Sequence, residues 1–223
     1  MKIVFALGGS VVVPDKVDEK YVAKFAEFAL ELAKKHTLAI VVGGGKTARR
    51  AIAEARKRGE NEVQCDYAGI GASRYNASII SQAMSIEPFI PETLLDAKKI
   101  LETEGIILMG GTEPGHSTDA VAALLAELID ADLILKVTDV DGIYDKDPQE
   151  HKGAKMFEKL PVDQLESMVR GLSQAAGKYE LFDLLAVKIL KRSHIKCIVL
   201  NGRDLKNMGD AIGGKKFKGT LIQ

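Results

Sequence analysis

Residues 38–46, LAIVVGGGK, decide the fold class, because an apolar and partly β-branched run ends directly in three glycines. A short apolar run bounded by glycine predicts a buried strand, here over residues 38–42. The residues from Lys46 to about Arg58 have a helical pattern that is rich in basic side chains. The sequence therefore predicts a unit of strand, glycine loop and helix.

The same unit recurs along the chain. Further strands are expected at residues 3–7, 106–109, 133–137, 197–200 and 219–222, with a short one near Phe89. Further helices are expected at residues 22–33, 67–84, 118–129, 161–169 and 182–193. Either Ser117 or Thr118 can cap the helix that begins near residue 118. These repeated units predict a three-layer αβα sandwich with a largely parallel central sheet.

The composition limits the possible functions. The 223 residues are 46% hydrophobic and 28% charged, and 31 basic residues balance 31 acidic ones. That balance argues against a general nucleic-acid or membrane-surface binder, which would carry a basic excess. We expect no signal peptide before the first expected strand, and no apolar run in the sequence approaches the roughly 20 residues that span a bilayer. We expect a cytoplasmic protein with buried free thiols at Cys65 and Cys197, although a disulfide between them stays open.

Three glycine-rich loops follow expected strands. Their sequences are GGS at residues 8–10, GGGK at 43–46 and GGTEPGHST at 110–118. The carboxyl ends of parallel strands meet at one edge of a sheet, where ligands bind. Glycine lets the backbone approach an anion, and successive N–H groups at a helix N-terminus favour phosphate. The three loops together predict a phosphate-binding edge.

The second loop does not match the best-known nucleotide motifs. GKT at residues 45–47 resembles the end of a Walker A loop, but that motif needs glycine at position 40, where Ile40 stands. Residues 43–48, GGGKTA, meet a loose form of the dinucleotide pattern. The acidic residue that should end the next strand is instead Asp66, before an expected helix that it could cap. The P-loop interpretation fails, and the dinucleotide interpretation is weak.

The order of the motifs resembles the amino-acid-kinase superfamily. The motifs are FALGGS at residues 5–10, VVGGGK at 41–46, GGTEPGHSTDA at 110–120 and TDVDGIY at 138–144. Their detailed forms, with LAVKI at residues 185–189, resemble archaeal-type UMP kinases over essentially the whole chain. The resemblance implies one domain of amino-acid-kinase fold, 1–223, with a phosphate-acceptor lobe to about residue 150 and an ATP-binding lobe from about 151 to 223.

The resemblance also implies a role for each matching residue. Those that would bind ATP are Gly9, Ser10, Gly45, Arg49, Thr138, Asp139, Tyr144 and Asp147. Those that would bind UMP are Gly44, Asp66, Thr112, Glu113, Pro114, Gly115, His116, Ser117 and Thr118. Those that would act on the transferring phosphoryl group, directly or by orienting a lysine, are Lys188, Asp119 and Lys46.

The activity implied by the resemblance is a UMP kinase of pyrimidine nucleotide synthesis, which makes UDP from UMP and ATP. Mg²⁺ would enter with ATP, no metal site on the protein is implied, and the chain would form a homohexamer. Phosphoryl transfer consists mainly of in-line positioning and charge neutralisation. Glycine-loop amides and basic side chains can supply both.

Two positions depart from the family pattern. Many kinases of the superfamily carry a lysine two residues before the first glycine, where this chain has Ala6, although the archaeal-type UMP kinases often lack it too. Its absence shifts charge neutralisation to Lys46, Lys188 and the metal. Relatives usually carry asparagine where this chain has Asp139, which loses an amide donor and adds negative charge beside the nucleotide.

Two alternatives stay open. Kinases of isopentenyl phosphate, carbamate or an acylated amino acid share the fold, but isopentenyl phosphate kinases typically carry a histidine-containing segment after the second loop. This chain has KTARR at residues 46–50 instead. The other alternative is a non-catalytic nucleotide-binding protein, against which Lys188 and Asp119 argue.

Overall fold

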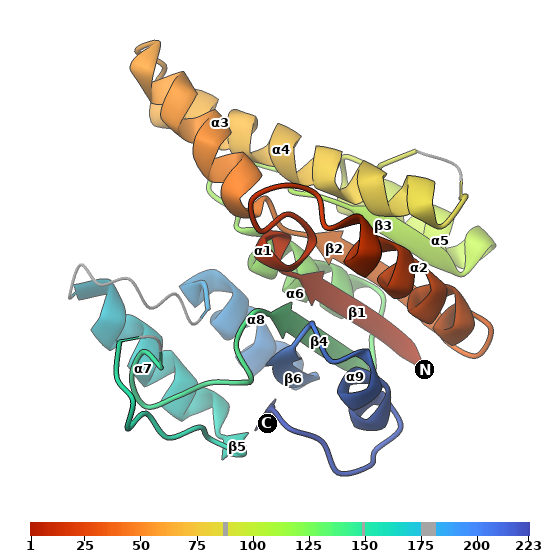
Figure 1. Cartoon of the computed structure of the whole chain (residues 1–223), viewed down its shortest axis with the longest axis vertical. Coiled ribbons are helices and arrows are strands. Elements are labelled where there is room, and N and C mark those ends of the chain that lie inside the picture. The colour runs from red at the N-terminus through yellow and green to blue at the C-terminus, as the bar shows by residue number, and fades with distance from the viewer. Residues whose placement is uncertain (87–88, 149, 175–181) are drawn as a thin grey trace.

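The computed structural model describes residues 1–86, 89–148, 150–174 and 182–223 (Figure 1). Its strands are β1 (Lys2–Leu7), β2 (Thr37–Val42), β3 (Ile106–Met109), β4 (Leu133–Thr138), β5 (Lys159–Leu160), β6 (Lys196–Asn201) and β7 (Thr220–Ile222). Its helices are α1 (Gly9–Val12), α2 (Glu19–Ala33), α3 (Gly45–Lys57), α4 (Glu62–Ala83), α5 (Leu94–Glu104), α6 (Thr118–Leu128), α7 (Val162–Gln174), α8 (Leu184–Ser193) and α9 (Leu205–Ile212).

The strands form one sheet in the order β3-β2-β1-β4-β6-β7-β5. Neighbouring strands are parallel except β6 and β7, which are antiparallel. Strand β1 lies between β2 and β4, with Ala6 opposite Val41 on one side and Lys136 on the other. The carboxyl ends of β1, β2 and β3 therefore meet at one edge, which carries the three glycine loops. The predicted αβα sandwich with a largely parallel sheet is confirmed.

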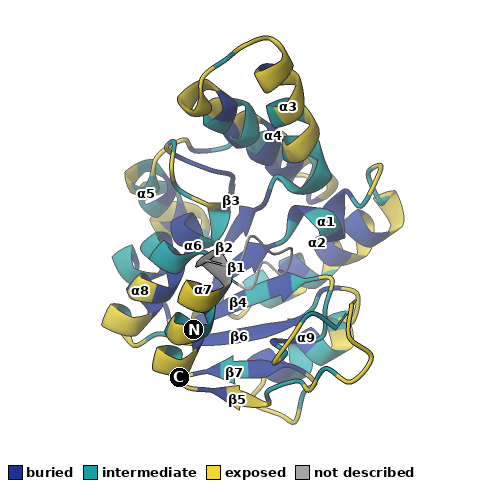
Figure 2. Ribbon diagram, turned by 90° about the vertical axis from the view of Figure 1, so that its left-hand side faces the viewer, coloured by how far each residue is buried: buried dark blue, intermediate teal, exposed yellow. Residues whose placement is uncertain are grey.

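Two apolar layers hold the helices against the sheet (Figure 2). Ala6 of β1 faces the layer that contains α5, α6, α7 and α8, whereas Phe5 faces the layer that contains α2, α4 and α9. Because both faces are covered, β1 is apolar along its length rather than alternating. The fully buried Phe5 ring packs edge to face on Phe25 at 6.1 Å between centroids. Burial of such a side chain stabilises the fold by about 1.5–3 kcal/mol.

Helix α4 begins earlier than the sequence predicted. Asn61 is its N-cap: the Asn61 side chain accepts a hydrogen bond from the Gln64 amide at 3.0 Å, and the Gln64 side chain accepts one from the Asn61 amide at 2.9 Å. This capping box satisfies donors at the start of the helix. The expectation that Asp66 caps the helix is therefore wrong, because Asp66 lies inside α4.

Several other local predictions can be compared with the structure. Ser117, one of the two candidate caps, does cap α6 by accepting from the Ala120 amide at 3.0 Å. The strand expected near Phe89 is wrong at residues 89–90, which are irregular, while residues 87–88 lie outside the described part of the chain. The sequence pattern missed α1, α5, α9 and β5. Helix α5 has recognisable end signals, a Thr93 N-cap and a left-handed Gly105.

Two further expectations concern burial and membranes. Cys65 and Cys197 are both buried and free, which confirms the expectation of unpaired thiols. Across the described ranges, no helix is long and apolar enough to cross a bilayer.

Thr220 ties the segment after β4 to the sheet. Its fully buried hydroxyl accepts a hydrogen bond from the Ile143 amide at 2.8 Å and donates one to the Phe157 carbonyl at 2.5 Å. We expect Thr220→Val to lower the free energy of unfolding by about 1–3 kcal/mol, because the buried Ile143 amide and the partly buried Phe157 carbonyl lose their partner. Urea unfolding measures this change.

The matched control is Thr103→Val, since the exposed Thr103 hydroxyl donates to the Ile100 carbonyl of its own helix at 2.9 Å and bonds no other described residue. That change should alter stability by less than about 0.5 kcal/mol. Equal stability of Thr220→Val and the wild type would contradict the prediction.

Candidate active site

The first two glycine loops touch through backbone alone. A Cβ atom at Gly9 would lie 2.4 Å from the Gly43 carbonyl oxygen and 2.4 Å from the Gly45 nitrogen, so no larger residue fits there. Gly45 has a φ of +53°, which side-chain-bearing residues rarely adopt. The start of α1 and the start of α3 are thereby brought together at the sheet edge.

Asn76 of α4 holds the second loop in place. Its fully buried amide nitrogen donates to the carbonyls of Gly43, at 2.9 Å, and Gly44, at 3.1 Å. Its side-chain oxygen has no hydrogen-bond partner among the described residues. Asn76 was not among the residues predicted from the sequence, although an amide side chain between the apolar positions of a predicted helix was an available signal.

The third loop is also held by α4. The Gly111 amide donates to the Ser73 hydroxyl at 2.8 Å, and Arg74 Nε donates to the Gly111 carbonyl at 3.0 Å. The Gly115 amide donates to Asp66 Oδ2 at 2.8 Å. Ser73 and Arg74 were missed as well, because their contacts reach a loop more than 35 residues away in the chain. One helix therefore fixes two glycine loops relative to each other.

Between these elements lies a cavity of about 360 Å³. The predicted site residues that line it are Gly44, Gly45, Arg49, Asp66, Glu113, His116, Ser117 and Thr118. The other lining residues are Ala48, Ile52, Gly69, Ile70, Ser73 and Gly111. Thr112, Pro114 and Gly115 belong to the same loop without lining the cavity, and Thr112 is buried.

The start of α3 gives this cavity an affinity for anions. Gly44 is the N-cap of the helix and has no side chain with which to cap the first amides. Such amides carry partial positive charge at a helix N-terminus. Gly44, Gly45 and Ala48 line the cavity, and Arg49 adds a full positive charge. These donors suit a phosphate group.

A charge pair lies at the same sheet edge. Asp119, in the first turn of α6, accepts a hydrogen bond from Lys136 of β4. The Lys136 side chain is 14% exposed and the Asp119 side chain 22%. In every other ion pair that joins two described residues, at least one side chain is more than a quarter exposed. Asp119 was predicted from the sequence motif, whereas Lys136 was not, although a single lysine in an apolar strand was an available signal.

The other two predicted catalytic residues lie in exposed positions. Lys46 donates to Asp15 at 2.7 Å, with 45% of the Lys46 side chain exposed. The hydrogen bond and charge of Lys46 lower the pKa of the Asp15 carboxyl. Lys188 is exposed on α8 and is not one of the cavity-lining residues. Both roles stay predictions.

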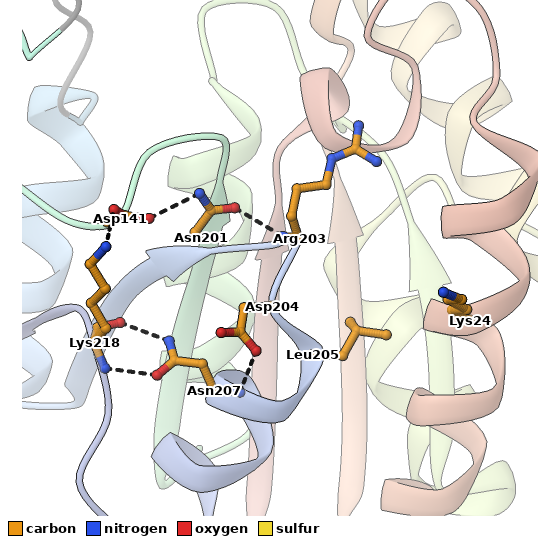
Figure 3. Close-up of a pocket in the computed structure, with 8 residues that line it drawn as sticks. All are labelled: Lys24, Asp141, Asn201, Arg203, Asp204, Leu205, Asn207 and Lys218. Carbon is orange, nitrogen blue, oxygen red and sulfur yellow. Dashed lines mark hydrogen bonds and ion pairs between the residues drawn. The ribbon is translucent and has the colours of Figure 1, made fainter.

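The residues predicted for the adenine and ribose of ATP, Thr138, Asp139, Tyr144 and Asp147, lie on or just after the end of β4. The Asn201 side chain braces this segment by donating to Asp141 Oδ1 at 3.0 Å and to the Asp139 carbonyl at 3.4 Å. A second cavity of about 560 Å³ lies beside Asp141, on the side of α2 and α9 (Figure 3). None of the four predicted residues lines it; its lining is Lys24, Asp141, Asn201, Arg203, Asp204, Leu205, Asn207 and Lys218.

Comparison with known proteins shows which families and proteins this chain resembles. The model of the amino acid kinase family matches residues 1–201. The chain is 40% identical to a uridylate kinase of Methanobrevibacter smithii, over 100% of this chain and 99% of that protein. It is 43% identical to a uridylate kinase of Methanocaldococcus jannaschii, over 100% of both.

Solved structures of uridylate and UMP kinases also match the chain. The crystal structure of uridylate kinase from Archaeoglobus fulgidus matches with a TM-score of 0.89 and 39% identity, over 100% of both chains. A UMP kinase from Ureaplasma parvum matches with a TM-score of 0.81 at 22% identity, over 100% of this chain and 98% of that one, and so shares the fold.

The support that Asn76 gives the second loop can be tested. We expect Asn76→Leu, which keeps the volume but removes both donors, to lower the free energy of unfolding by about 1–3 kcal/mol. Hydrogen exchange of peptides that cover residues 43–48 should also become faster than in the wild type. The control is Ser78→Ala in the same helix, because the exposed Ser78 hydroxyl donates to the Tyr75 carbonyl and to no other group in the described part of the chain. An unchanged hydrogen-exchange rate of residues 43–48 in Asn76→Leu would show that the second loop keeps its structure without the Asn76 hydrogen bonds.

Proposed function

Because this chain belongs to the amino acid kinase family, and within it to the archaeal-type UMP kinases, we propose that it transfers the γ-phosphoryl group of ATP to UMP. The observation that carries the proposal is the cavity at the start of α3, where uncapped amides, Arg49 and Asp66 surround one space. A nucleoside monophosphate needs cationic donors for its phosphate and an acceptor for its ribose. The product would be UDP, for pyrimidine nucleotide synthesis.

The two substrates would meet at the second glycine loop. Gly44 and Asp66 would hold UMP, with Asp66 accepting from ribose hydroxyls, since a carboxylate has acceptor capacity beyond its bond from Gly115. Gly45 and Arg49 line the same cavity and would face the ATP phosphates. Gly9, in contact with this loop, would extend the ATP side. This arrangement favours in-line transfer, which depends on positioning.

Mg²⁺ would be carried mainly by the phosphates of ATP. This ion usually keeps several waters and binds through one or two carboxylates together with substrate phosphates. Within the described ranges, no group of three or more His, Cys, Asp or Glu side chains is placed to hold a metal. At the active edge, Asp119 is engaged by Lys136, and Asp183 accepts from the Ser117 hydroxyl at 2.9 Å. When bound with ATP, the ion would neutralise phosphate charge.

The activity is tested with a panel of phosphate acceptors. Purified protein with ATP and Mg²⁺ should convert UMP to UDP faster than it phosphorylates CMP, AMP, isopentenyl phosphate or carbamate, with ADP release as the common measurement. Faster turnover of isopentenyl phosphate or carbamate would assign the chain to another kinase of the family. Nucleotide binding without any ADP release would instead indicate a non-catalytic binding protein.

We further propose that the chain self-associates, as in the homohexamer implied by its resemblance, through the outer face of α4. Val63, Tyr67 and Tyr75 are 54%, 56% and 60% exposed, and Gly71 between them leaves open space. Their spacing of four residues, or twice four, forms one ridge along the helix, which is the geometry by which two helices interlock. A glycine within such a ridge allows close approach.

Sedimentation velocity tests this interface. The wild type should sediment as an oligomer, and Tyr67→Glu with Tyr75→Glu should shift it to a smaller species, because two carboxylates would be buried without partners. Leu95→Glu is the control, since Leu95 is 63% exposed on α5, outside this ridge. An unchanged mass for the double variant would place the interface elsewhere.

A further inference from the structure

Lys136 is a lysine enclosed at the active edge. It stands in β4 among apolar residues, LILKVT, and its side chain is 14% exposed. Its ammonium donates to Asp119 Oδ2 and lies 4.3 Å from the centre of the Phe182 ring. An ammonium group has three donors, and its hydrogen bonds to the described residues use one of them.

Both contacts place this ammonium beside the phosphate-binding loops. Asp119 lies in the first turn of α6, directly after the third loop, and Phe182 lies just before the N-cap of α8. Helix α8 leads into the amino end of β6, so its N-terminus lies at the carboxyl edge of the sheet. The hydroxyl of Thr118, next to Asp119, lies 3.3 Å from where a Gly43 Cβ would be. The three loops and Lys136 thus share one region.

The position is unfavourable for a cation that only supports the fold. Enclosure removes water from the ammonium, and the N-terminus of α6 carries partial positive charge, whereas the N-terminus of α8 is capped by the Asp183 carboxylate. Asp119 offsets this, but an ion pair is often no more stabilising than apolar side chains of similar size. A negatively charged ligand at this edge would find the ammonium already placed and partly desolvated.

We propose that Lys136 is a catalytic residue that contacts the transferring phosphoryl group, and that Asp119 positions its ammonium; the proposal rests on the proposed function. In the transfer, an oxygen of the UMP phosphate forms a bond to the γ-phosphorus as the bond from that phosphorus to the ADP oxygen breaks. Charge spreads over the equatorial oxygens of the moving group. The Lys136 ammonium would stabilise that charge without giving up a proton.

The neighbouring residue on β1 supports this assignment. Ala6 is the register partner of Lys136 on the adjacent parallel strand, so both side chains project from the same face. Because the Ala6 side chain is small, it leaves room for the Lys136 side chain over β1 and β4. Lys46 and Lys188, the lysines that the sequence suggested, are both more exposed. Lys136 is therefore the enclosed lysine beside Asp119, next to the third loop, although like Lys188 it is not among the residues that line the cavity.

The test measures kcat and KM for UMP in single variants. Lys136→Met should lower kcat by about 100-fold to 1,000-fold, as removal of a group that acts on transition-state charge does, while KM for UMP changes less than about threefold. Lys196→Met is the matched control, since Lys196 is exposed at the amino end of β6, and its turnover should equal that of the wild type. Lys188→Ala, assayed alongside, shows which lysine matters more.

A rescue experiment separates catalysis from support of the fold. Ala6→Lys added to Lys136→Met places a new ammonium on the adjacent strand and should restore kcat at least tenfold, whereas Ala6→Leu in the same background should not. If Lys136→Met is unfolded, Lys136→Met with Asp119→Asn removes both charges together and should fold with the same low kcat. Urea unfolding of each variant accompanies the assay.

The outcomes distinguish the two proposals. An active wild type with undiminished kcat in folded Lys136→Met, or in the double variant, overturns the role of Lys136 and leaves the proposed function standing. A kcat loss that Ala6→Lys and Ala6→Leu restore equally also overturns it, because packing would then explain the effect. A wild type that makes no UDP overturns the proposed function, and this proposal with it.

Discussion

The active edge depends on the contact between Gly9 and the Gly43–Gly45 backbone, which no side chain separates. Parallel pairing of β1 and β2 places the two strand ends side by side, but only glycines let the loops that follow close on each other. The contact brings the start of α1 against the start of α3. Backbone amides from two loops are thereby presented together, and a phosphate can be bound without many charged side chains.

Helix α4 fixes the glycine loops around the cavity by hydrogen bonds. Asn76 holds the second loop, Ser73 and Arg74 hold the third, and Asp66 reaches the tip of the third loop. Since one rigid helix of 22 residues makes all these bonds, the loops cannot move independently without breaking buried hydrogen bonds. The exposed face of the same helix is the surface that we assign to self-association, so assembly and site geometry would be linked through α4.

The sequence predicted the sandwich and its glycine edge because those features are local: apolar strands, glycine loops and helical periodicity appear in short windows. It could not place Asn76 or Ser73, because their partners lie more than 30 residues away. It also assigned Asp66 to a helix start, since the Asn61–Gln64 capping box lies in a stretch without apolar periodicity. Asp119 was found through its motif, but its partner Lys136 was not, because a lysine in a strand has no motif of its own.

The charge at the site follows from the same geometry. The N-terminus of α3 opens on the cavity and supplies positive potential there, whereas the N-termini of α6 and α8 at the same edge carry the carboxylates of Asp119 and Asp183. An enclosed lysine ammonium lowers the stability of the fold unless an anion accompanies it, and the Asp119 carboxylate is that anion in the free protein. A bound phosphoryl group would share the ammonium with Asp119. An enclosed lysine is thus stronger evidence of a functional role than an exposed one, because removing its charge from water costs free energy of folding.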